Sequence, residues 1–218
     1  MNWNQIFATR TKAMHASEIR ELLKLLDQPD IISFAGGIPD PDLFPTAEFE
    51  QAYHDILTGD RQASALQYSV SEGYLPLRQW IADHMGEIDI ACGVDNILIT
   101  SGSQQALDYI GKLFLSPQDT ALVAWPTYLG ALGAFNAYEP IYDRLIAGGN
   151  RSANDYQATA QANNSAVKFA YMSVDFANPT GETMNRAERD GLLDMAERLN
   201  TVIVEDAILS STSTSRSS

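Results

Sequence analysis

Four short segments place polar or aromatic side chains at the ends of apolar runs, where side chains can meet a ligand. The segment TSGSQQ carries Ser101 and Ser103 at the start of a helical pattern. Backbone N–H groups at a helix N-terminus, together with hydroxyls, can bind an anion such as phosphate. A plain turn with an N-cap explains the same residues, because the segment matches neither of the common glycine-rich phosphate motifs.

The other three segments offer a ring, an amide and an acid. Tyr128 in WPTY could stack on a flat ligand, although a core tyrosine after a turn proline fits equally. Asn178 in DFANPTG offers a rigidly held amide, although turn chemistry alone accounts for the Pro and Gly. Asp206 ends an apolar run, and a carboxylate there needs a cationic or hydrogen-bonding partner.

The elements that must position these side chains follow an alternating pattern after residue 95. We expect strands at 96–100, 120–125, 140–146, 167–174 and 201–206, and helices at 104–114, 128–137 and 186–200. Residues 148–164 are polar and weakly patterned, and we assign no element there. Earlier in the chain we expect helices after Ser17, around 48–57 and within 66–85. The predicted fold class is α/β, a mostly parallel sheet with flanking helices, whose strand ends share one edge.

Composition narrows the function classes. The net charge of −14 and the sequence pI of about 4.4 argue against nucleic acid or an anionic membrane as partner. The single cysteine, Cys92, excludes an internal disulfide, and it has no cluster around it that would form a thiolate metal site. No signal peptide and no membrane-spanning run is apparent, so we expect a cytoplasmic protein that uses no metal.

An anion site, a stacking ring, an amide and an acid that can pair with a cationic ring nitrogen are together what pyridoxal 5'-phosphate (PLP) requires. From about Ser17 to Asp206 the chain resembles the class I/II, fold type I PLP-dependent aminotransferases, especially the branch of 2-aminoadipate and broad-specificity enzymes. The resemblance rests on SEIRELLKLL, ISFAGGIPDPDLFP, LQYSVSEGYLPLR, TSGSQQALDYIGKLF, PTYLGAL, DFANPTGETM and VIVEDA.

The resemblance implies a role for each candidate residue in binding the cofactor. Ser101, Ser103 and Gln104 would hold the phosphate. Tyr128 would stack on the pyridine ring and Asn178 would bind its O3'. Asp206 would pair with the ring nitrogen and keep it protonated, which makes the ring an electron sink.

The resemblance also implies contacts to substrate and to a second subunit. Tyr68 would reach the phosphate of the neighbouring subunit in a homodimer. Gly37 would line the substrate side, and Arg20 could meet a substrate carboxylate, although an exposed helix arginine explains Arg20 as well. The substrates implied are an amino acid and a 2-oxo acid.

The match stops just after Asp206. The family has Asp-x-Ala-Tyr there, followed later by the lysine that forms the Schiff base, whereas this chain continues Ala207, Ile208, Leu209 and ends in a Ser/Thr-rich tail. All four lysines precede the acid, so no catalytic residue is assigned. We expect a frame change near Asp206, with a native disordered tail as the alternative.

The expected product is an N-terminal fragment of such an enzyme. It would comprise an N-terminal helix and substrate-side loop at 1–45, a partial PLP-binding large domain at 46–209 and a disordered tail at 210–218. The sheet would be incomplete, because in the family later strands insert beside the strand ending at Asp206, and a C-terminal small domain follows them. We expect the chain to lack transaminase activity. The alternatives are a non-catalytic PLP-binding or dimer-poisoning subunit, or another fold type I enzyme such as a lyase.

Overall fold

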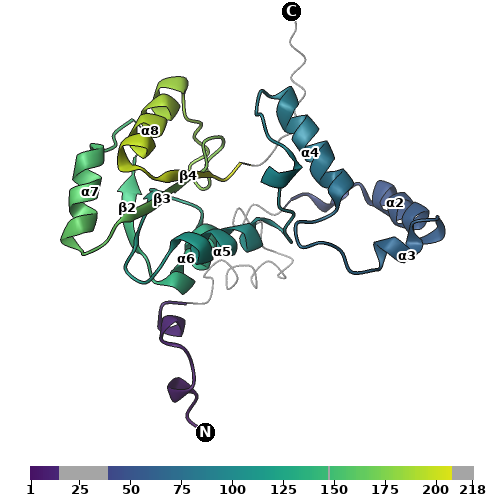
Figure 1. The fold of residues 1–218 in the computed structure, drawn as a ribbon, viewed down its shortest axis with the longest axis horizontal. Coiled ribbons are helices and arrows are strands. Elements are labelled where there is room, and N and C mark those ends of the chain that lie inside the picture. The colour runs from purple at the N-terminus through teal and green to yellow at the C-terminus, as the bar shows by residue number, and fades with distance from the viewer. Residues whose placement is uncertain (15–38, 147, 208–218) are drawn as a thin grey trace, which may run out of the picture. The chain divides into compact units, whose positions relative to one another are not determined.

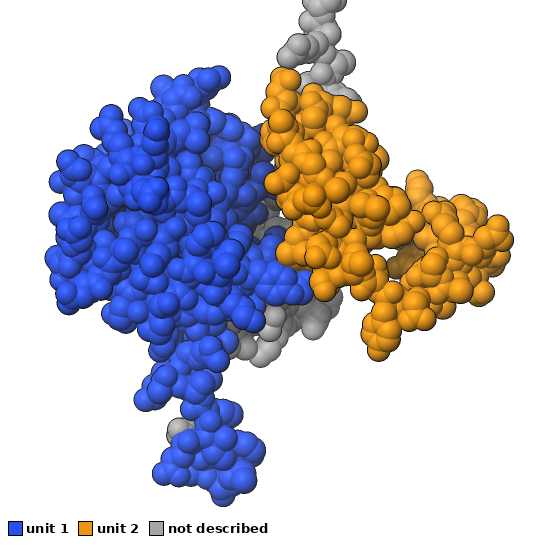
Figure 2. All heavy atoms as spheres, in the orientation of Figure 1, with its two compact units in different colours: residues 1–15, 102–218 blue, residues 16–101 orange. Residues whose placement is uncertain are grey.

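The computed structural model describes residues 1–14, 39–146 and 148–207. Arg20, Gly37, the helix expected after Ser17 and the tail 210–218 lie outside the described residues. The chain divides into two compact units, one formed by residues 1–15 and 102–218 and the other by residues 16–101 (Figure 2). Each unit is described by itself.

The larger unit contains a four-stranded sheet in which every pairing is parallel (Figure 1). The strands are β1 (Thr120–Ala124), β2 (Ile141–Leu145), β3 (Val167–Met172) and β4 (Val202–Glu205), in the order β2-β1-β3-β4. Four of the five predicted strands and the parallel arrangement are therefore confirmed.

Helices cover both faces of this sheet. On one face α5 (Ser103–Phe114) and α6 (Leu129–Phe135), which continues into η5 (Asn136–Tyr138), contribute to one hydrophobic cluster. On the other face α7 (Ala153–Ala162) and α8 (Arg186–Leu199) contribute to a second cluster. Strand β1 contributes side chains to both clusters: Val123 belongs to the first and Leu122 to the second. This burial on both faces explains why the central strand β1, with the sequence TALVA, is almost wholly apolar and does not alternate.

Two expectations about secondary structure were wrong. Residues 97–100 form no strand: η4 (Val94–Asn96) precedes them, and although Ile97 has extended backbone, Ile99 N donates to Glu72 O. A strand needs a paired neighbour, which an apolar pattern cannot supply. Conversely, α7 forms where no element was expected. Its signal is the capping box of Ser152 and Asp155, which satisfies the first backbone N–H groups of a weakly amphipathic helix.

The smaller unit is helical in its described part, residues 39–101. It contains η3 (Pro41–Leu43), α2 (Thr46–Thr58), α3 (Gln62–Ala65), α4 (Leu75–Glu87) and η4. The helices α2 and α4 confirm the two patterns expected at 48–57 and within 66–85. Arg78 on α4 is buried, and its guanidinium donates to the carbonyls of Val94 and Ile97. This arginine fixes the segment around η4 to the helix.

The first residues of the chain form two short 3-10 helices, η1 (Trp3–Gln5) and η2 (Thr9–Lys12), and η2 contacts η5 of the larger unit. Across the described ranges, no helix combines the length and apolarity required to cross a bilayer.

Candidate functional site

Asp206 lies directly beyond β4, at the carboxyl edge of the sheet. Its backbone N–H donates to Met172 O at 2.9 Å, which extends the pairing of β4 with β3 by one residue. Val204 packs against the cluster under α5 and α6, and side chains alternate along a strand, so Asp206 faces the same side as these helices. The carboxylate is half-buried there.

Tyr171 holds the Asp206 side chain. This tyrosine is fully buried in β3, and its hydroxyl donates to Asp206 Oδ2 at 2.7 Å. Burial raises the pKa of Tyr171, and the hydrogen bond and charge of Asp206 raise it further, so the phenol stays a neutral donor. Sequence reasoning missed Tyr171. The available signal was a tyrosine in an otherwise apolar strand, where a buried hydroxyl requires a partner.

Tyr128 lies at the carboxyl end of β1, as expected from its position after WPT. It is the N-cap residue of α6, is half-buried and packs against the cluster that contains Tyr171. Its ring lies over Gly130, where an added Cβ would come within 2.4 Å of the ring. The position of this ring therefore depends on a residue without a side chain, which sequence reasoning also missed.

The N-terminus of α5 lies at the same edge. The N-cap is Gly102, whose φ of +81° favours glycine. The space beside it is open, since a Cβ there would meet nothing within 4 Å. Ser101 precedes it and Ser103 is the exposed first residue of the helix. Gln104 Nε2 donates to Gly130 O at 2.9 Å, which connects α5 to the first turn of α6, next to Tyr128.

Asn178 lies in the loop between β3 and α8 and is exposed. The turn is closed by hydrogen bonds from Gly181 N to Ala177 O and from Ala177 N to Glu182 O. Within the residues that the structure describes, Asn178 makes no hydrogen bond with Asp206 or Tyr128. The structure therefore brings Asn178 to the carboxyl edge without bringing it into contact with these two side chains.

Tyr68 belongs to the smaller unit, between α3 and α4, and is 99% exposed. Arg20 and Gly37 lie outside the described residues. The structure thus brings Asp206, Tyr128 and the N-terminus of α5 to one edge of the sheet. The expected contacts of Tyr68, Arg20 and Gly37 stay predictions.

Residues 29–215 match the family "Aminotransferase class I and II". The chain belongs to this family. It is 39% identical over 211 residues to aromatic-amino-acid aminotransferase 1 of Thermococcus litoralis, an alignment that covers 94% of this chain and 50% of that protein. The chain thus spans about half the length of the curated relatives that it matches.

Two solved structures of aminotransferases share the fold. The kynurenine aminotransferase of Pyrococcus horikoshii, solved in complex with PMP, is 39% identical, with a TM-score of 0.82 over 94% of this chain and 52% of that one. The alpha-aminoadipate aminotransferase of Thermus thermophilus, complexed with N-(5'-phosphopyridoxyl)-L-leucine, is 38% identical, with a TM-score of 0.78 over 95% and 50%. The expected α/β architecture of fold type I aminotransferases is confirmed, as is the expected family.

The positions of the lysines bear on catalysis, because the family resemblance implies a lysine that forms the Schiff base. Among the described residues, Lys168 is the second residue of β3, at the opposite edge, where it pairs with Asp119 at 3.5 Å. Lys112 lies in the last turn of α5, and Lys12 lies in η2. Lys24 is outside the described residues. No described lysine lies at the carboxyl edge.

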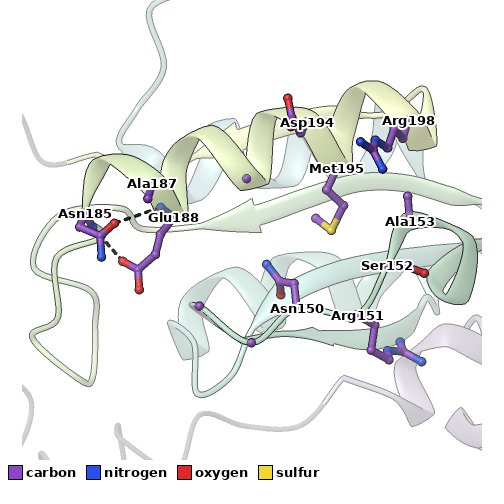
Figure 3. A pocket seen from close by; sticks show the side chains of 13 residues that line it. Asn150, Arg151, Ser152, Ala153, Asn185, Ala187, Glu188, Asp194, Met195 and Arg198 are labelled. Atoms are coloured by element: carbon purple, nitrogen blue, oxygen red, sulfur yellow. Dashed lines mark hydrogen bonds between the residues drawn. The ribbon is translucent and has the colours of Figure 1, made fainter.

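A groove lies between α7, α8 and the segment 148–152. Its volume is about 590 Å³, and Met195 points into it from α8 (Figure 3). Much of its polar lining already serves the fold: Asn185 and Glu188 cap α8, and Arg151 pairs with Asp143. We therefore place the candidate site at Asp206, which does not line this groove.

A second groove of about 410 Å³ lies at the carboxyl ends of β1, β2 and β3, lined in part by Trp125, Ser173 and Glu182. It adjoins the strand ends without including Asp206, Tyr128 or Asn178. Within the described ranges, no group of three or more His, Cys, Asp or Glu side chains is arranged to hold a metal ion.

Proposed function

We propose that this chain forms the part of a PLP-dependent aminotransferase that holds the phosphate and the pyridine ring of the cofactor. The observation that carries the proposal is the Asp206 carboxylate, fixed beyond β4 by Tyr171 at 2.7 Å, on the sheet face that also carries Tyr128 and α5. The relatives solved with PMP and with a phosphopyridoxyl amino acid support the same cofactor class.

The residues at this edge suit a phosphorylated pyridine. The first turn of α5 directs backbone N–H groups and a partial positive charge toward the open space at Gly102, which suits a phosphate. Ser101, Ser103 and Gln104 would add side-chain donors. Tyr128 would lie against the ring face, and Asn178 would donate to its O3'.

Asp206 would accept a hydrogen bond from the protonated ring nitrogen. An ionised carboxylate close to that nitrogen favours its charged form, because opposite charges within about 4–6 Å stabilise each other. When bound, PLP supplies an electron sink that lets an amino acid lose its α-proton and exchange its amino group for the oxygen of a 2-oxo acid. Asp206 would maintain that property by keeping the nitrogen protonated.

The 218 residues on their own should bind without turnover. No described lysine lies at the carboxyl edge, and proton transfer at the substrate carbon needs a positioned base. The substrates of the whole protein would be an amino acid and a 2-oxo acid. The expected division at residues 45 and 209, and a cytoplasmic location, stay predictions.

Binding of pyridoxamine 5'-phosphate (PMP) tests this proposal. PMP has no aldehyde, so it cannot bind covalently to surface lysines, and its affinity can be measured by calorimetry on the 218-residue chain. We expect saturable 1:1 binding that inorganic phosphate competes with, and a loss of at least about tenfold in affinity for Asp206→Ala. Asp194→Ala, which removes an exposed acid of the groove between α7 and α8, is the matched control.

Absence of PMP binding by the wild-type chain at millimolar concentration would contradict the cofactor site. Equal losses for Asp206→Ala and Asp194→Ala would contradict its location. Transamination by the purified 218-residue chain would contradict binding without turnover.

Pairing with an intact family member is the second candidate, and the exposure of Tyr68 favours it. A tyrosine ring that is 99% exposed, close in sequence to exposed Leu66 and Val70, suits a protein interface. We expect co-expression with a full-length homologue to give a mixed dimer in size-exclusion chromatography, and Tyr68→Ala to weaken it. Purely monomeric chain under the same conditions would count against a homodimeric or dimer-poisoning role.

A further inference from the structure

The Asp206 carboxylate has two oxygens, and the structure assigns only one of them a partner. Oδ2 accepts from the Tyr171 hydroxyl at 2.7 Å. Among the described residues, Oδ1 accepts no hydrogen bond. The backbone of Asp206 is fixed by the bond from its N–H to Met172 O, so both restraints on this residue come from β3. One oxygen is thus anchored while the other remains able to accept.

Tyr171 is itself held rigidly. Its ring meets the ring of Phe135 edge to face, with centroids 5.5 Å apart and planes at 80°. Phe135 in turn packs on Phe169 at 5.1 Å, and all three side chains are fully buried in one cluster. A buried aromatic ring surrounded in this way has one available position, so its hydroxyl defines a fixed point at the sheet edge.

On the basis of the proposed function, we propose that Tyr171 is the positioning residue of the cofactor site. Its phenol holds Asp206 in the one orientation in which Oδ1 can accept a hydrogen bond from the nitrogen of a pyridine ring. Tyr171 does not touch the ring and acts only through Asp206.

The chemistry of the pair supports this role. A hydroxyl that donates to a carboxylate stabilises the ionised carboxylate, and the ionised form is the stronger acceptor for a protonated nitrogen. The raised pKa of Tyr171, caused first by burial and then by Asp206, keeps the phenol protonated as a donor over the neutral range. Because the hydrogen bond is already made, the cofactor would not have to order the acid on binding.

The variant Tyr171→Phe tests the inference, because phenylalanine keeps the ring that packs on Phe135 and removes only the hydroxyl. Tyr142→Phe is the matched control: it removes the hydroxyl of a second tyrosine, which is partly buried on β2 and donates to Asn136 Oδ1 at 2.8 Å. Circular dichroism would check that both variants fold. The first measurement is the χ1 distribution of Asp206 from three-bond NMR couplings. The second is the affinity for PMP, together with the pH dependence of the absorbance of bound PMP.

We expect a single Asp206 rotamer in wild type and Tyr142→Phe, and averaging between rotamers in Tyr171→Phe. Tyr171→Phe should bind PMP about tenfold more weakly than wild type, and the bound ring nitrogen should lose its proton at lower pH. Tyr142→Phe should leave affinity and pH profile unchanged within about twofold.

PMP binding by wild type and by Tyr171→Phe distinguishes the positioning role of Tyr171 from the cofactor site itself. If wild type binds PMP and Tyr171→Phe binds it equally well with the same pH profile, the positioning role is overturned and the cofactor site stands. If Tyr171→Phe keeps a single Asp206 rotamer, the role is also overturned. If wild type does not bind PMP, the cofactor site fails, and the inference falls with it.

Discussion

The two units of this chain differ in where their apolar side chains lie. In the larger unit the described residues form two buried clusters on opposite faces of a parallel sheet, with Phe135, Phe169 and Leu122 fully buried. In residues 39–101 of the smaller unit, Arg78 and Ala82 are the buried side chains. One region is stabilised by an apolar core and the other by a buried arginine that bonds backbone carbonyls.

Helix α2 has a helical pattern of apolar residues that is not buried. Its apolar residues Phe49, Tyr53, Ile56 and Leu57 recur at helical spacing, yet all of its residues are exposed. Helix α5 has a similar stripe, but its Leu107 is buried against the sheet. Periodicity therefore predicts that a helix forms, and it does not predict the surface on which the helix packs.

The largest effect should come from removing the centre of the apolar core. Phe135→Ala deletes a ring that contacts both Phe169 and Tyr171, and we expect it to lower the free energy of unfolding by about 3–5 kcal/mol. Urea denaturation followed by circular dichroism measures this loss. Leu129→Ala, on the same helix but 55% exposed, is the control and should cost much less. Similar losses for both variants would mean that the larger unit has no such core.

The corresponding change in the smaller unit should have a smaller, local effect. Arg78→Ala leaves the carbonyls of Val94 and Ile97 without their donor, at a cost of about 1–3 kcal/mol. Hydrogen exchange should show faster exchange around residues 94–99 and little change in β1 to β4. Exposed Arg61→Ala is the control. Equal acceleration in the sheet would show that the two regions unfold together and would break the comparison.

A helix cap in the larger unit should matter less than either. Asn185→Ala removes the side chain that accepts from Glu188 N at 3.1 Å, and we expect a cost of about 1 kcal/mol. Thermal unfolding measures the difference from Arg186→Ala, whose exposed ion pair with Asp190 contributes little. If both variants unfold at the same temperature, the cap does not stabilise α8.

The smallest effect on stability should come from Gly130→Ala. This variant should change PMP binding while it leaves the free energy of unfolding nearly unchanged. Alanine favours the helix by up to about 1 kcal/mol relative to glycine, which compensates for displacing the outer end of the Tyr128 ring. Stability should therefore stay within about 1 kcal/mol of wild type, while PMP binding weakens because the ring is moved. Gly133→Ala, on the same helix with open space around its Cβ, is the control. Unchanged PMP affinity in Gly130→Ala would show that Tyr128 is not a ring contact.

Much of the candidate site was predictable because its residues follow strands. Asp206, Tyr128 and Ser103 all come directly after apolar runs or start the next helix, and the parallel topology then requires a shared edge. Tyr171 and Gly130 were not predictable in the same way. Their importance rests on a hydroxyl that meets a carboxylate 35 residues away and on a ring that folds back over a glycine.

The sequence by itself determined the local elements and the family. Apolar runs define β1 to β4, helical stripes define α2, α4, α5 and α8, and the motifs around Ser103, Asn178 and Asp206 indicate class I/II aminotransferases. Tertiary structure alone decided which of these patterns are used. The apolar residues 97–100 do not become a strand of the described sheet, and Asp206 is oriented because β3 supplies a phenol. The physical reason is that a hydrogen-bond partner distant in sequence leaves no periodic signal in the chain.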